Sequence, residues 1–125
     1  MTGTFLLCIG SALVILWSIA HIVPTKSVVE GFGPLTDDNK RIITMEWVAE
    51  GLALSFIGLL VLAVVILGDT HNPVSVLVFR ASALMLLVLA GWTAVTGART
   101  SIVPIKICPL ILTLSAVLIL LGSFL

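Results

Sequence analysis

Four long apolar stretches constrain the fold of this chain more than any other feature of its sequence. They cover residues 4–23, 42–67, 74–97 and 105–125 of the 125-residue chain. A helix that crosses the hydrocarbon of a bilayer needs about 20 apolar residues, because each residue rises 1.5 Å. The stretches are continuous rather than alternating, which excludes a transmembrane β-barrel. The sequence therefore predicts an all-α, integral membrane four-helix bundle with up-and-down topology, in a single domain over residues 1–125.

The composition indicates that little of the chain lies outside the bilayer. Apolar residues make up 60% of it and charged residues 10%, whereas soluble domains carry about a quarter charged residues. Six basic and six acidic residues cancel, so we expect no nucleic-acid partner. A chain this small leaves little room for a central pore. We therefore expect contact with membrane lipid and assembly into homo-oligomers or a larger membrane complex.

Proline, glycine and polar residues mark where the helices end. Residues 24–41 are expected to form an interfacial loop, because Pro24 and the Gly31–Pro34 segment interrupt helices. Thr36, followed by two aspartates, is typical of a helix N-cap, so the second helix can begin near Asp37. Residues 68–73 form a tight turn, with Pro73 suited to the first position of the third helix. Pro109 either lies in the first turns of the fourth helix or kinks it.

The basic residues predict how the bundle is oriented. An even number of spans puts both termini and the 68–73 turn on one side, which we call the terminal face. The opposite side, the basic face, carries Lys26, Lys40, Arg41, Arg99 and Lys106. The positive-inside rule makes the basic face cytoplasmic and both termini extracytoplasmic. Aromatic belts should mark the two levels, with Trp17, Trp47 and Trp92 near the basic face and Phe5, Phe79 and Phe124 near the terminal face.

Ionisable residues inside the spans mark a candidate site. Each costs about 2.5–3.5 kcal/mol at the centre of a span on insertion scales. Glu46 and Glu50 are four residues apart and so share one face of the second helix, as His21 and Trp17 do on the first. Both pairs fall in the half near the basic face. We expect one polar layer there, formed by His21, Glu46, Glu50, Trp17, Trp47, Trp92, Thr93, Thr96 and Arg99.

This layer has a functional and a structural interpretation. It could carry a proton, bind an amphiphile headgroup or a quinone, or hold a metal through His21, Glu46 and Glu50. Alternatively, Glu46 simply reaches water, His21 is interfacial, and Glu50 locks the bundle through Arg99 or Thr96. Arg80 and Lys106 are expected to reach lipid headgroups. Small residues at Gly51, Ser55 and Gly58 favour close helix packing.

Three function classes follow from these residues. The first is an accessory or structural subunit, or a lipid-contacting bundle, with a polar site near one membrane face. The second is a proton-coupled small-molecule transporter or channel component that works as an oligomer. The third is a redox protein that binds quinone, haem or metal, with His21 as ligand. An enzyme is disfavoured, because no nucleophile is paired with a base. The sequence specifies no cofactor, and Cys8 and Cys108 should lie too far apart in depth to form a disulfide.

Overall fold

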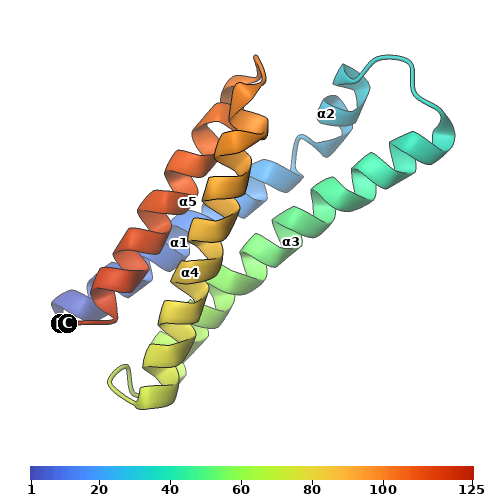
Figure 1. The fold of residues 1–125 in the computed structure, drawn as a ribbon. Helices are drawn as coiled ribbons and strands as arrows, with labels where there is room; N and C mark the ends of the chain where they lie inside the picture. The colour runs from blue at the N-terminus through green and yellow to red at the C-terminus, as the bar shows by residue number, and fades with distance from the viewer.

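The computed structural model describes residues 1–125, which form helices and no strand. The helices are α1 (Thr2–Ile22), α2 (Thr25–Gly31), α3 (Asp37–Leu67), α4 (Pro73–Val95), the 3₁₀ turn η1 (Gly97–Arg99) and α5 (Val103–Gly122). The long helices run alternately up and down, and the two termini lie together at one end (Figure 1). Four helices are long and apolar enough to cross a membrane. The prediction of an all-helical chain with four helices long and apolar enough to cross a membrane is confirmed, and it suggests a multi-pass membrane protein.

Side-chain caps begin α3 and α4 at the predicted residues. The Thr36 hydroxyl accepts a hydrogen bond from the Asn39 backbone N–H at 3.2 Å, and Asp37 and Asp38 occupy the first turn of α3. The Asn72 side chain accepts one from the Val74 N–H at 2.9 Å, just before Pro73. Each cap satisfies a backbone donor that the helix itself leaves free. Both predicted starts are therefore confirmed.

Three details differ from what the sequence suggested or decide what it left open. The expected loop over residues 24–41 contains the short helix α2, which ends before Gly33, where φ is +78°. Pro109 lies in the second turn of α5, and Pro104 stands at the start of the helix. Phe79 is fully buried in the core, whereas Phe5 and Phe124 are exposed. The prediction of an aromatic belt was therefore wrong for Phe79, because its side chain points between helices.

The helices do not pack as a symmetric square. α1 contacts both α3 and α5, α5 also contacts α4, and α3 and α4 make few contacts with each other. Starting from their shared turn at residues 68–73, α3 and α4 diverge toward the opposite end of the molecule (Figure 1). Only 25 of the 125 residues are buried, and every long helix keeps an exposed apolar face. Such a surface is suited to lipid or to partner helices rather than to water.

Small residues build the contact between α1 and α3. A Cβ atom on Gly58 would come within 2.6 Å of Ile15 Cγ1 and 3.0 Å of the Ser11 carbonyl oxygen. Gly51 meets Ile22 and His21 in the same way. Between these glycines, the hydroxyls of Ser18 and Ser55 are 2.6 Å apart and share a hydrogen bond. The predicted role of small residues in close packing is confirmed for this pair of helices.

Candidate functional site

A groove lies between α3 and α4 in the half of the bundle where the two helices diverge. Its volume is about 450 Å³, within the usual range for small-molecule sites. Eight of its ten lining residues are hydrophobic, and the other two are glutamates. The lining consists of Ile42, Ile43, Glu46, Trp47, Ala49, Glu50, Ala53 and Ile57 from α3 and Met85 and Leu89 from α4.

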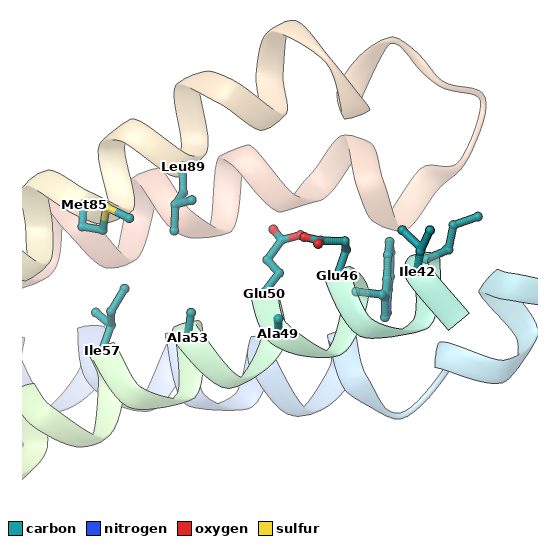
Figure 2. Close-up of a pocket in the computed structure, with 10 residues that line it drawn as sticks. Ile42, Glu46, Ala49, Glu50, Ala53, Ile57, Met85 and Leu89 are labelled. Atoms are coloured by element: carbon teal, nitrogen blue, oxygen red, sulfur yellow. The ribbon is translucent and has the colours of Figure 1, made fainter. Parts of the chain in front are cut away.

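Helix periodicity explains which α3 residues face the groove. Glu46, Ala49, Glu50, Ala53 and Ile57 recur at intervals of three and four residues, so they form one stripe along the helix. The two alanines contribute little volume in the middle of this stripe. Figure 2 shows the stripe turned toward Met85 and Leu89 of α4. The groove therefore arises where small side chains meet a helix pair that packs loosely.

The two glutamates lie together at one end of the groove. Both side chains rise from α3 into the space beside α4, and their carboxylates turn toward each other (Figure 2). The Glu50 side chain is 34% exposed, and Glu46 is exposed as well. The expectation that their spacing puts them on one helix face is confirmed.

His21 holds the α3 side of this end in place. Its ring stacks on the Trp47 ring at a centroid distance of 4.1 Å and an interplanar angle of 10°. His21 Nε2 lies 3.0 Å from the Trp47 carbonyl oxygen and 3.8 Å from Glu50 Oε2. In return, Trp47 Nε1–H donates to the His21 carbonyl oxygen at 2.7 Å. Since a carbonyl oxygen only accepts, Nε2 carries the proton in this arrangement.

The remaining members of the predicted polar layer do not join this cluster. Trp17 donates to Cys108 Sγ at 3.3 Å, in the contact between α1 and α5. Thr93 and Thr96 donate to carbonyl oxygens of their own helix. Trp92 and Arg99 are exposed. The partner of Glu50 is therefore His21, and the expected lock through Arg99 or Thr96 does not form.

Neither a metal centre nor a disulfide is assembled from the candidate residues. No three His, Cys, Asp or Glu side chains come close enough together to hold a metal ion. His21 also directs its Nε2–H at a carbonyl oxygen, so this nitrogen has no lone pair for a metal. Cys8 and Cys108 are both free cysteines.

The two predicted lipid-contact residues lie at opposite ends of the bundle. Arg80 lies over the Phe124 ring, with its Cζ 4.3 Å from the ring centroid, and its Nε is 3.5 Å from Ser123 Oγ. These neighbours place it beside the C-terminus, on the terminal face. Lys106 is exposed in the first turn of α5, on the basic face.

Sequence reasoning found Glu46, Trp47 and Glu50 but missed the other residues that line the groove. Ala49 and Ala53 share the glutamate stripe, and this small-residue pattern beside two acids was a usable signal. Met85 and Leu89 could not be predicted, because the sequence around them does not show which helix this side of α4 faces. No family model, curated protein or solved structure matches the chain, so the geometry alone supports a functional interpretation.

Proposed function

We propose that this chain is a small multi-pass membrane protein that binds an amphiphilic, lipid-like molecule in the groove between α3 and α4. The observation that carries the proposal is the groove itself, which is apolar along its length and carries two carboxylates at one end. An amphiphile matches this pattern, because its tail would contact the apolar lining while its headgroup lies beside the glutamates. The proposal makes the chain a lipid-contacting bundle with a specific site.

The depth of the glutamates agrees with a headgroup level. α3 has 31 residues and is therefore about 46 Å long, more than the hydrocarbon core of about 30 Å requires. Measured along the helix from Leu67 at the terminal face, Glu50 lies at about 25 Å and Glu46 at about 31 Å. Glu46 would thus lie at the boundary of the hydrocarbon, and Glu50 about one turn inside it. The rest of the groove runs from Glu50 toward the centre of the bilayer.

One substitution tests whether the groove binds amphiphiles. Ala53→Phe adds a ring in the middle of the groove lining, whereas Ala63→Phe adds the same ring at an exposed α3 position outside it. The probe is monodecanoylglycerol, a neutral single-chain amphiphile, added to protein in a maltoside detergent and counted by native mass spectrometry. We expect saturable binding to the unmodified chain and to Ala63→Phe, and at least a tenfold weaker affinity for Ala53→Phe. Equal binding by the two variants would refute the proposal.

A second candidate, a proton-coupled carrier, is favoured by one observation. Glu50 borders the groove and also lies 3.8 Å from His21 Nε2, so a bound molecule and a proton could compete for the same carboxylate. In liposomes, a carrier would accumulate an amphiphile only under an imposed proton gradient, and Glu50→Ala would abolish this uptake. Gradient-independent retention of the probe would instead support binding alone.

A further inference from the structure

We propose that the molecule bound in the α3–α4 groove carries a cationic headgroup of the ammonium class on a single alkyl chain. This inference rests on the proposed function and names the ligand class of the same site. It joins the apolar length of the groove with the uncompensated negative charge at one end of it.

The charge at the mouth of the groove has no basic partner. None of the ten lining residues is a lysine or an arginine. The chain forms ion pairs only between His21 and Glu50 and between Lys26 and Glu30. Glu46 therefore has no ionic partner, and Glu50 has only a histidine. Two neighbouring carboxylates repel each other, so a cation placed between them lowers their electrostatic energy.

The surroundings of Glu50 favour an ammonium group over a bare metal ion. Most of the lining around the two carboxylates is apolar, and Trp47 beside them has one face of its ring stacked on His21. The ligand set for a metal is incomplete, because no three suitable side chains converge. An organic cation needs no fixed coordination number and gains from the apolar side chains that surround it.

The rest of the groove fits one alkyl chain. Its apolar lining continues from Glu50 to Ile57, seven residues and about 10 Å along α3. Met85 and Leu89 of α4 form the opposite wall (Figure 2). Ala53, between the headgroup end and Ile57, leaves the space that a chain of methylene groups would fill. Packing against the apolar lining would hold the tail, and the carboxylates select the headgroup.

Three amphiphiles with the same chain length separate the role of charge from that of the tail. Decyltrimethylammonium, monodecanoylglycerol and decyl sulfate are cationic, neutral and anionic. We expect native mass spectrometry to show that the unmodified chain binds the ammonium at least tenfold more tightly than the neutral probe, and the sulfate least. Glu50→Gln and Glu46→Gln should each weaken ammonium binding severalfold while leaving the neutral probe unchanged. The matched control is Glu30→Gln, which removes an exposed acid that does not line the groove.

The outcomes distinguish this inference from the proposed function. If the neutral probe binds and is blocked by Ala53→Phe but the ammonium shows no preference, the groove binds amphiphiles and the inference about charge is wrong. If none of the three probes binds saturably, the proposed function fails as well. If Ala53→Phe changes the number of chains in the complex instead of probe binding, the groove is a contact between copies of the chain, and both proposals are overturned. Tight binding of the ammonium probe that is weakened by Glu50→Gln would support both the proposed function and the inference about charge.

Discussion

His21 and Trp47 join the end of α1 to α3 through two reciprocal hydrogen bonds and a ring stack. Each side chain donates to the backbone carbonyl oxygen of the other residue. The last carbonyl groups of a helix lack partners within the helix, and α1 ends at Ile22. Trp47 therefore satisfies an acceptor that would otherwise be left free at the end of α1. The same contact holds His21 against Glu50, so the structure of the groove depends on it.

Trp47→Phe should therefore destabilise the bundle. Phenylalanine keeps an aromatic ring for the stack but loses the N–H that donates to His21, and a buried hydrogen bond contributes about 1 kcal/mol. We expect thermal unfolding in detergent to begin at a lower temperature, with a loss of about 1 kcal/mol. Trp92→Phe is the matched control, because Trp92 is 67% exposed. Equal stability of the two variants would show that the hydrogen bond contributes nothing.

At this scale the sequence predicted the residues better than their partners. The helical period predicted that Glu46 and Glu50 share one helix face. The apolar runs predicted that both lie, like His21, in the half of the bundle near the basic face. The pairing of Glu50 with His21 rather than Arg99 depends on how closely α1 approaches α3. That approach is set by Gly51, which leaves room for His21 and Ile22 beside it. Spacing within one helix cannot show such a contact between helices.

Among the helix pairs, α1 and α3 approach each other through glycine and serine. Without a hydrophobic driving force in lipid, such pairs are held by van der Waals packing and interhelical hydrogen bonds. Gly58 packs against Val14, Ile15 and the backbone of Ser11. The Ser18–Ser55 hydrogen bond lies in the same interface. Together these contacts hold α1 against α3, the helix that carries most of the groove residues.

Gly58→Ala should weaken the contact between α1 and α3. The added methyl group would lie 2.6–3.0 Å from Ile15, Val14 and Ser11, so the helices must separate or the side chains must shift. Overpacking of this kind costs about 1–3 kcal/mol. Gly91→Ala is the control, because nothing lies within 4 Å of its new Cβ, and alanine should stabilise α4 by up to about 1 kcal/mol. Denaturation in mixed micelles measures both changes, and a neutral Gly58→Ala would contradict the close contact.

The helices themselves were largely predictable because their signals are local. Long apolar runs set the spans, and Thr36, Asn72 and Pro73 set where α3 and α4 begin. The short helix α2 was not predicted, because Pro24 and the following glycines indicate interruption without showing that Thr25–Gly31 can form two turns between them. The burial of Phe79 was missed for a different reason. Its depth near the terminal face is correct for an interfacial ring, but depth does not determine which side of a helix faces the core.

The groove is a property of the whole molecule, since it depends on the order of the helices around the bundle. α1 and α5 are neighbours, so α3 and α4 lie on the flanks and meet mainly near their connecting turn. A symmetric bundle with α3 packed on α4 has the same sequence pattern and no groove. Sequence reasoning therefore could not predict the site beyond its glutamates and Trp47. The long helices leave apolar faces exposed, so assembly into homo-oligomers or a larger complex stays a prediction.

The orientation of the molecule decides which side of the membrane the groove opens toward. The positive-inside rule depends on lysine and arginine in short connections, and the basic residues gather beside α2, the start of α3 and the start of α5. The groove glutamates lie in the same half. We therefore predict that an amphiphile enters from the cytoplasmic leaflet, with its headgroup near the basic face.

Cysteine labelling tests this orientation. In a background with Cys8→Ala and Cys108→Ala, Ser27→Cys places a thiol on α2, and His71→Cys places one in the α3–α4 turn; both positions are exposed. A membrane-impermeant maleimide should label His71→Cys in intact cells and Ser27→Cys only after permeabilisation. The cysteine-free protein, treated with the same maleimide, is the control for background labelling. The reverse labelling pattern would place the groove toward the extracytoplasmic leaflet. Labelling of both thiols in intact cells would mean that the chain inserts in both directions. The five basic residues would then fail to determine its topology.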